Sequence, residues 1–424
     1  MSIFLDTKSP HLHQPSLSKD SIQVVLLEDV HHNAIDHLVR LGYTSVACHA
    51  KALEGDDLTH AIRHAHIVGI RSRTKLTQSV LQCAPKLFAI GCFCIGTNQV
   101  DAEAARIMGV PVFNAPYSNT RSVAELVLGS IIMLARRVPE KNWNAHRGVW
   151  LKTTEGACEV RGKTLGIIGY GHIGTQLSVL AEALGMRVIF YDCLEKLALG
   201  NAHRCPNLAT LLAESDFVSL HVPDTPQTRD MMTATELAQM KPGAALLNAS
   251  RGRVVDVGAL AGALTSGHLS GAAIDVFPDE PADEQDPFTS PLRGLRNVLL
   301  TPHIGGSTLE AQANIGTEVA EKLTTYSDNG STMGAVNFPE AQLLHQRHNS
   351  LRFIHIHRNA PGVMTQINEI ISAQGANIIG QHLQTSSDIG YVVFDLENLD
   401  TEDTLPTQQM LHSIPGTIRA RFLS

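Results

Sequence analysis

The chain has 424 residues, more than one ordinary domain uses, so two or three domains are expected. Hydrophobic residues make up 43% and charged residues 17%, a balance that is typical of a globular protein with a substantial core. A formal net charge of −8 without a strongly basic run argues against nucleic acid as a partner, and no apolar stretch approaches the roughly 20 residues that span a membrane.

The N-terminal segment does not have the charged, apolar and small-residue order of a signal peptide. It is polar and interrupted by proline, so a disordered extension is expected over residues 1–20. The seven cysteines include no CxxC pair. Cys92 and Cys94 could form a reactive pair, but buried, reduced thiols are the expectation, and with them a cytoplasmic protein without a metal site.

From residue 21 onward, short β-rich runs alternate with helical patterns, which predicts a parallel sheet covered by helices. An apolar helix over residues 123–138 follows; it is too short to span a membrane and is expected to lie buried and to join two lobes. The expected strands are 23–27, 46–47, 67–71 and 87–90, and the expected helices are 33–41, 55–65 and 77–83.

The most informative stretch runs from residue 165 to Asp192, where strand 165–168 leads into Gly169-Tyr-Gly171-His-Ile-Gly174 and a helical pattern. In a dinucleotide-binding turn, the first glycine permits the tight bend, the second lets the backbone approach a pyrophosphate, and the third lets helix and strand pack closely. The N–H groups at the helix start then hold the anion. Asp192 ends the next strand, 187–191, near the spacing at which a carboxylate reaches the ribose hydroxyls, which favours NAD over NADP.

The alternation continues after Asp192 and predicts a doubly wound parallel sheet of the Rossmann type over residues 119–306. A helix over 308–326 could return the chain to the first lobe, so a flavodoxin-like α/β substrate domain is expected from residues 21–118 and 307–340. A polar linker, 328–350, precedes a βαββαβ unit over 350–424, which is the ferredoxin-like order. The remaining expected elements are helices 207–214, 234–239, 257–266, 362–374 and 402–413, and strands 217–220, 245–248, 271–275, 298–300, 351–357, 377–384, 391–396 and 417–422.

Three segments place a charged or titratable residue just after a predicted strand: Arg251 in LLNASRG, Glu280 in AAIDVFPDEP and His303 in LTPHIGG. The carboxyl ends of strands in a doubly wound sheet face the ligand crevice, so the three side chains are expected to meet near the nicotinamide. His303 can accept the proton that oxidation of a hydroxyl releases, and Glu280 can hold its other ring nitrogen. Arg251 can hold a carboxylate in a fork. Each residue alone is more often structural, but together they predict hydride transfer at a 2-hydroxy acid.

The motifs GYGHIGTQ, HVPDTPQTRDM, LLNASRGRVVD, AAIDVFPDEP and TPHIGGST resemble those of the D-isomer-specific 2-hydroxyacid dehydrogenases, from about residue 20 to the C-terminus. The resemblance implies that Arg251, Glu280 and His303 are catalytic. Beside the glycines and Asp192, it implies cofactor contacts at His172, Ile173, Ala249, Ser250, Arg251, Asp275, His303, Gly305 and Gly306.

The segment IRSRTKLT supplies several cations directly after a strand, as a substrate with both a phosphate and a carboxylate requires. The family motif RSRT implies substrate contacts at Arg71, Ser72 and Arg73, with Asn114 and Lys152 as further candidates. This favours family members that oxidise 3-phospho-D-glycerate to 3-phosphohydroxypyruvate, the first step of L-serine synthesis, and that can also reduce 2-oxoglutarate to 2-hydroxyglutarate.

The C-terminal unit resembles the ACT regulatory domain, which binds amino acids between paired copies. HIHRNAPG and GANI match its effector loop and the partner of that loop, so the resemblance implies that L-serine binds at His357, Asn359 and Asn377 as a feedback inhibitor. The linker segment LHQRHN does not have the paired glycines of a flexible hinge, which bears on the strength of inhibition. A homotetramer is the implied assembly.

Two other functions stay open. A glyoxylate or hydroxypyruvate reductase would need fewer cations than Arg71 and Arg73 supply, and formate dehydrogenases carry an amide where Glu280 stands. A binding protein that senses NAD, as transcriptional corepressors of the family do, would keep the same three catalytic residues. The cationic segment and the amino-acid-binding domain favour a metabolic enzyme instead.

Overall fold

The computed structural model describes residues 17–281, 285–343, 346 and 350–423, which form two compact units. The first unit combines the chain up to Pro116 with the chain from Ala313 onward, and the second spans Tyr117–Gln312. The predicted N-terminal extension lies outside the described residues up to residue 16. The 3-10 helix η1 (Lys19–Ser21) follows, and the Lys19 ammonium pairs with Asp328 at 2.7 Å.

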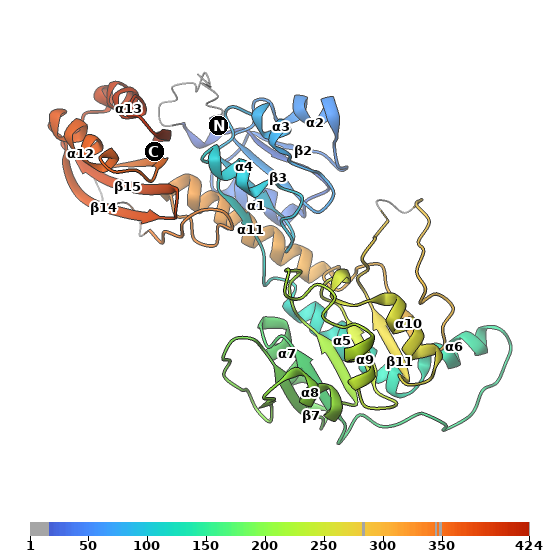
Figure 1. Cartoon of the computed structure of the whole chain (residues 1–424). Helices are drawn as coiled ribbons and strands as arrows, with labels where there is room; N and C mark the ends of the chain where they lie inside the picture. The colour runs from blue at the N-terminus through green and yellow to red at the C-terminus, as the bar shows by residue number, and fades with distance from the viewer. Residues whose placement is uncertain (1–16, 282–284, 344–345, 347–349, 424) are drawn as a thin grey trace, which may run out of the picture. The chain divides into compact units, whose positions relative to one another are not determined.

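A five-stranded parallel sheet in the first unit has the order β2-β1-β3-β4-β5, which is the flavodoxin-like order that the sequence predicts. Its central strands are short apolar runs that are buried along their whole length. Helix α4 and strand β5 were not predicted, because six and three residues carry too little periodicity. The elements are β1 (Val24–Leu26), β2 (Val46–Cys48), β3 (Ile67–Ile70), β4 (Ala89–Cys92), β5 (Val112–Asn114), α1 (His32–Arg40), α2 (Gly55–Ile62), α3 (Gln78–Gln82), α4 (Ala102–Ile107) and α11 (Leu309–Asn329) (Figure 1).

The C-terminal part of the first unit is an antiparallel sheet of order β14-β15-β13-β16, with the predicted βαββαβ connectivity. The segment predicted to be a polar linker begins inside α11, and its residues 330–343 pack against the lobe: Thr332, Phe338 and Ala341 are buried, and the Thr332 hydroxyl donates to the Pro339 carbonyl at 2.7 Å. Residues 344–345 and 347–349 of that segment lie outside the described residues. The elements are β13 (Leu351–Arg358), α12 (Val363–Ala373), β14 (Asn377–Thr385), β15 (Ile389–Glu397), η3 (Thr401–Asp403), α13 (Thr404–His412) and β16 (Thr417–Leu423).

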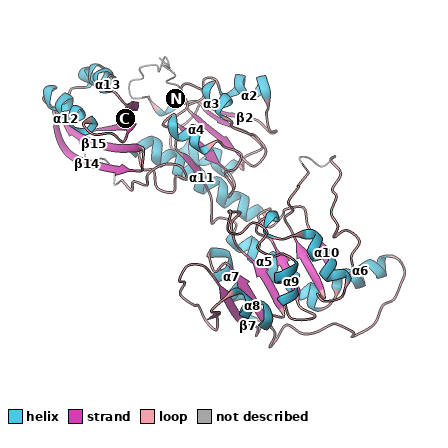
Figure 2. Ribbon diagram, in the orientation of Figure 1, coloured by secondary structure: helices cyan, strands magenta, loops and turns pink. Residues whose placement is uncertain are grey.

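The second unit is built on a seven-stranded parallel sheet of order β12-β11-β10-β9-β6-β7-β8. Counted from β6, this is the Rossmann order 3-2-1-4-5-6 with one more strand, flanked by helices as Figure 2 shows. The elements are α5 (Thr120–Ala135), α6 (Val138–His146), β6 (Thr164–Ile168), α7 (His172–Ala183), β7 (Arg187–Tyr191), β8 (His203–Arg204), α8 (Leu208–Glu214), β9 (Phe217–Leu220), α9 (Ala234–Gln239), β10 (Ala245–Asn248), η2 (Gly252–Val254), α10 (Val257–Thr265), β11 (Gly271–Ile274) and β12 (Val298–Leu300).

The apolar helix predicted over residues 123–138 is wrong at its C-terminal end, because the structure has two helices there. Arg137 adopts a left-handed conformation with φ of 53°, and Pro139 in the first turn of α6 has no N–H to continue the first helix. Helix α5 packs against the second unit's sheet through Val127, Ile131 and Leu134. Across the described ranges, no helix is both long and apolar enough to cross a membrane.

Candidate active site

The glycine-rich turn follows β6 and has the steric requirements that its pattern predicts. Gly169 has a φ of +91°, and a Cβ there would lie 2.3 Å from the His221 carbonyl oxygen. A Cβ on Gly174 would lie 2.3 Å from the Gly169 carbonyl oxygen, so only glycine lets α7 start this close to the strand. Nothing lies within 4 Å of a Cβ on Gly171, which leaves open space on that side of the turn.

The turn also brings together groups that suit a dinucleotide. The Asp192 carboxylate accepts the Tyr170 N–H at 2.8 Å and the Leu194 N–H at 2.9 Å, so it is fixed beside the turn. The first bond within α7 runs from Thr175 N–H to the Gly171 carbonyl, and the N–H groups of His172 and Ile173 precede it. Free N–H groups and open space for a pyrophosphate, with a carboxylate for a ribose, fit NAD.

His303 and Glu280 form an ion pair in the same unit. Nδ1 of His303 lies 2.8 Å from Oε2 of Glu280, while Oε1 accepts the Phe277 N–H at 3.1 Å. A carboxylate only accepts, so Nδ1 carries the proton, and Nε2 is the nitrogen that can exchange one with a ligand. The side chains are 52% and 37% exposed, so solvent and small molecules can reach them.

The contact between His303 and Glu280 changes the pKa of each side chain in the direction expected for a pair of opposite charges. The hydrogen bond to Glu280 raises the pKa of His303 above its ordinary value, against the opposing effect of burial. Burial of Glu280 acts to raise its pKa, but the bonds from His303 and from the Phe277 N–H outweigh it, and the pKa of Glu280 is lowered. Histidine therefore holds a proton more firmly here than in water.

Asp275 holds the loop that carries His303. Its carboxylate accepts the Thr301 hydroxyl at 2.6 Å, the Ile304 N–H at 2.9 Å and the Gly305 N–H at 2.8 Å, and its carbonyl accepts the His303 N–H at 2.8 Å. His303 itself has a φ of 54°, a left-handed conformation that is uncommon outside glycine. Asp275 is 3% exposed, so this loop is anchored from inside the domain.

Arg251 is held on a neighbouring loop after β10. The Asn248 amide donates to the Arg251 carbonyl at 2.9 Å, and its oxygen accepts the Ser250 N–H and hydroxyl. A Cβ on Gly252 would lie 2.0 Å from the Phe277 carbonyl group, so this loop presses directly on the loop of Glu280. The positive charge of Arg251 acts to lower the pKa of both His303 and Glu280, and the approach of Gly252 to Phe277 places the loops of Arg251 and Glu280 side by side.

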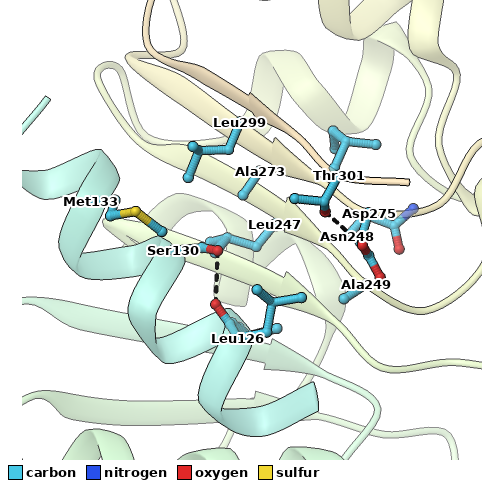
Figure 3. A pocket seen from close by; sticks show the side chains of 12 residues that line it. Leu126, Ser130, Met133, Leu247, Asn248, Ala249, Ala273, Asp275, Leu299 and Thr301 are labelled. Atoms are coloured by element: carbon cyan, nitrogen blue, oxygen red, sulfur yellow. Dashed lines mark hydrogen bonds between the residues drawn. The ribbon is translucent and has the colours of Figure 1, made fainter. Parts of the chain in front are cut away.

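A narrow pocket of about 50 Å³ opens between α5 and the ends of β10, β11 and β12 (Figure 3). Ala249 and Asp275, for which the sequence predicts contact with the nicotinamide, line it with Asn248 and Thr301. Leu126, Met133 and Leu299 give it an apolar floor. Gly305 is next to this region, since a Cβ there would lie 3.0 Å from the Asp275 carboxylate, and Gly306 packs on Asn119.

The predicted substrate residues are divided between the units. Arg71, Ser72 and Arg73 follow β3, and Asn114 ends β5 in the same sheet, with its amide donating to the Ile95 carbonyl at 2.6 Å. Lys152 is exposed and belongs to the second unit.

The predicted effector residues His357 and Asn377 lie on strands of the C-terminal sheet, and Asn359 directly follows β13. Asn359 and Asn377 are exposed, and the Asn359 amide donates to the Ser386 carbonyl at 3.0 Å. His357 is only 2% exposed, and its Nδ1 lies 3.3 Å from Nδ1 of His355. Burial lowers the pKa of His357, so its ring favours the neutral form.

Asn248, Gly252 and Thr301 were not predicted, although each shapes the loops of the site. Asn248 directly precedes the predicted residue Ala249, and Gly252 directly follows Arg251. Thr301 lies two positions before His303. Their closeness in sequence to predicted site residues could have pointed to them. Whether such a neighbour shapes the site depends on the direction of its side chain, which the sequence does not show.

Comparison with known proteins agrees with this geometry. Residues 128–305 match the family model described as D-isomer specific 2-hydroxyacid dehydrogenase, NAD binding domain, and residues 353–419 match an ACT domain like that of the AHAS small subunit. A D-lactate dehydrogenase from Aquifex aeolicus, solved with NAD and lactic acid, superposes with a TM-score of 0.63 and 27% identity over 72% of this chain and 95% of its own.

The curated relatives extend the match to nearly the whole chain. D-3-phosphoglycerate dehydrogenase of Escherichia coli K12 is 60% identical over 96% of this chain and 99% of its own. D-3-phosphoglycerate dehydrogenase 2 of Saccharomyces cerevisiae is 46% identical over 98% of this chain and 90% of its own. The chain belongs to the D-3-phosphoglycerate dehydrogenases, a group of the NAD-dependent, D-isomer-specific 2-hydroxyacid dehydrogenases.

Proposed function

We propose that this enzyme oxidises 3-phospho-D-glycerate to 3-phosphohydroxypyruvate with NAD, the first step of L-serine synthesis. The observation that carries the proposal is the His303–Glu280 pair with Arg251 on the adjacent loop. The names and high identity of the curated relatives support the choice of substrate.

In the proposed reaction, Nε2 of His303 accepts the proton of the substrate's C2 hydroxyl, while Glu280 stabilises the imidazolium that forms. The guanidinium of Arg251 holds the substrate carboxylate or the developing carbonyl oxygen. NAD, when bound, accepts the hydride from C2. The loop contacts of Asp275 keep His303 in position, so its geometry need not be rebuilt when substrate binds.

Binding of NAD is assigned to the glycine turn and to the strand ends beside it. His172 and Ile173 would hold the pyrophosphate through their N–H groups, and Asp192 the ribose. The pocket residues Ala249 and Asp275 would adjoin the nicotinamide, together with Ser250, Gly305 and Gly306.

Binding of the substrate's anionic groups is assigned to Arg71 and Arg73, with Ser72, Asn114 and Lys152 as further contacts. Phosphate and carboxylate are the groups that guanidinium binds best, because its planar donors match two oxygens at once. The proposed domains are residues 21–118 and 307–340 for substrate, 119–306 for NAD and 350–424 for regulation.

The test is NADH formation from 3-phospho-D-glycerate, compared with D-lactate and D-glycerate at equal concentrations. We expect kcat/KM for the phosphorylated substrate to exceed the others by at least about a hundredfold, since each lost ion pair removes about 1.5–3 kcal/mol. Equal rates with D-lactate would contradict the assignment of the substrate.

Regulation by L-serine is proposed at Asn359, Asn377 and His357, in a cytoplasmic homotetramer that also reduces 2-oxoglutarate. The match of residues 353–419 to an ACT domain supports an amino-acid effector. NADH formation with and without serine tests the regulation. Light scattering measures the mass of the assembly and so tests the homotetramer, and NADH consumption with 2-oxoglutarate tests the reduction. Asn359→Ala should weaken serine inhibition; unchanged inhibition would move the effector site elsewhere.

A further inference from the structure

A buried carboxylate lies directly beneath the cationic segment of the first unit. Strand β1 pairs with β3 in parallel, with Leu26 opposite Gly69, so the residues that follow the two strands meet at one edge of the sheet. Glu28 follows β1 and is 7% exposed, and Arg71 to Thr74 follow β3.

Three backbone N–H groups of the segment converge on this carboxylate. Oε1 of Glu28 accepts the N–H of Arg71 at 3.2 Å and of Thr74 at 2.8 Å, and Oε2 accepts the N–H of Arg73 at 2.9 Å. The Glu28 carbonyl also accepts from the Arg71 guanidinium at 3.4 Å. Converging N–H groups of this kind form a concave site that binds an anion, and here an internal carboxylate fills it.

The backbone around both residues is constrained. Glu28 and Asp29 have φ of 68° and 51°, left-handed conformations that persist only where the surrounding contacts demand them. On the other side of the segment, the Gln99 amide donates to the Arg71 carbonyl at 2.6 Å. The peptide groups on both sides of Arg71 are therefore held, one by Glu28 and one by Gln99.

We propose that Glu28 is a positioning residue for substrate binding: it organises the segment from which Arg71 and Arg73 bind the anionic groups of the substrate. Because Glu28 occupies the converging N–H groups, the substrate anion is left to the guanidinium side chains. The inference rests on the function proposed for Arg71 and Arg73, and Glu28 itself does not touch substrate.

The test is Glu28→Gln, which keeps the shape of the side chain but turns one acceptor oxygen into an NH₂ group that faces N–H donors. The substitution removes at least one charge-assisted hydrogen bond between the Glu28 carboxylate and the backbone at a buried site. We therefore expect the KM for 3-phospho-D-glycerate to rise about 10- to 100-fold. The KM for NAD and the affinity for NADH should stay within about twofold, and kcat should change less than KM, because the chemistry and the second unit are untouched.

Glu54→Gln is the matched control. Glu54 is an exposed carboxylate in the same lobe, at the N-terminus of α2, and its side chain makes no capping bond there. The KM of the Glu54→Gln enzyme for 3-phospho-D-glycerate should therefore be unchanged. Should Glu28→Gln fail to fold, Glu28→Asp replaces it: the charge remains but the shorter side chain cannot reach all three N–H groups, and an intermediate rise in KM is expected.

Arg71→Met and Arg73→Met separate the two hypotheses. If neither raises the KM for substrate, the function proposed for the arginines is wrong. If they raise it and the Glu28 variant does not, the positioning role is overturned while the arginine assignment stands. A Glu28 variant that raises the KM values for substrate and NAD alike would also overturn it, because that result indicates general damage to the fold.

Discussion

At the scale of single residues, the His303–Glu280 pair is placed for proton transfer and contributes little to stability. Both side chains are more than a third exposed, and ion pairs in contact with solvent contribute little to folding because water screens them. The measurable consequence is the raised pKa of His303. Oxidation requires the neutral imidazole as base, so the rate of oxidation should fall as the pH drops through that raised pKa.

Glu280→Gln should move this acidic limb of the pH–rate profile to lower pH. The amide removes the charge that stabilises the imidazolium, so the pKa of His303 falls and the neutral base persists further into acid. The rate at its optimum should drop by about 10²-fold, at the low end for a positioned acid–base group, because the ring loses its partner. kcat/KM for NADH formation measured across pH checks both effects, and an acidic limb that stays in place would contradict the proposed pairing.

Gly252→Ala should impair the site through the backbone. The added Cβ would lie 2.0 Å from the Phe277 carbonyl group, so the loops of Arg251 and Glu280 must separate. We expect a loss of about 1–3 kcal/mol in unfolding free energy, the usual cost of overpacking, together with a fall in kcat.

Gly262→Ala is the matched control for this substitution. Gly262 lies inside α10 with nothing within 4 Å of a Cβ, so alanine should stabilise the protein by up to about 1 kcal/mol and leave kcat unchanged. Urea unfolding and kcat of both variants decide the matter: equal behaviour of the two alanines would show that the close approach at Gly252 is unimportant.

At the scale of elements, the sequence predicts most long strands and helices, because buried parallel strands are apolar runs and helices repeat every 3.6 residues. It misses β5, which has three residues after Pro111, and it misses α6. It also extends α5 from Ala135 to residue 138, because the break at Arg137 is one left-handed residue. The approach of His303 to Glu280 was predictable, since strand ends meet at one edge of the sheet in this fold. The bond network of Glu28 was not, because it joins residues more than 40 positions apart.

The C-terminal sheet contains a buried ion pair whose removal should be costly. Arg352 on β13 lies opposite Asp395 on β15 and donates two bonds to it, of 2.7 and 2.8 Å, with side chains 2% and 9% exposed. Asp395→Asn leaves a buried guanidinium without its counter-charge, and we expect a loss of about 3–5 kcal/mol in unfolding free energy. Replacing both residues, by Met and Leu, should recover more than half of that loss. Urea unfolding of the three proteins gives the comparison, and a double variant as unstable as the single one would contradict it.

At the scale of the whole molecule, the C-terminal sheet and the flavodoxin-like lobe share one hydrophobic core. Ile354 and Tyr391 of the sheet belong to the same buried cluster as Phe88 and Tyr326 of the lobe. Arg421 adds a cation–π contact over the Phe88 ring at 4.3 Å. An effector that binds the sheet therefore acts on a body that also contains the predicted substrate arginines.

Calorimetry should accordingly show two unfolding transitions, although the described residues form three sheets. NAD at about 100 times its Kd adds about 2.7 kcal/mol to the unit that binds it, so it should raise the transition of the second unit. If serine binds the C-terminal sheet as proposed, it should raise the other transition as a whole, because that sheet and the flavodoxin-like lobe share one core and should unfold together. Asp395→Asn should lower that same transition and leave the one that responds to NAD in place. A third transition that responds to serine alone would show that the sheet unfolds independently, and the shared core would then not couple effector to substrate.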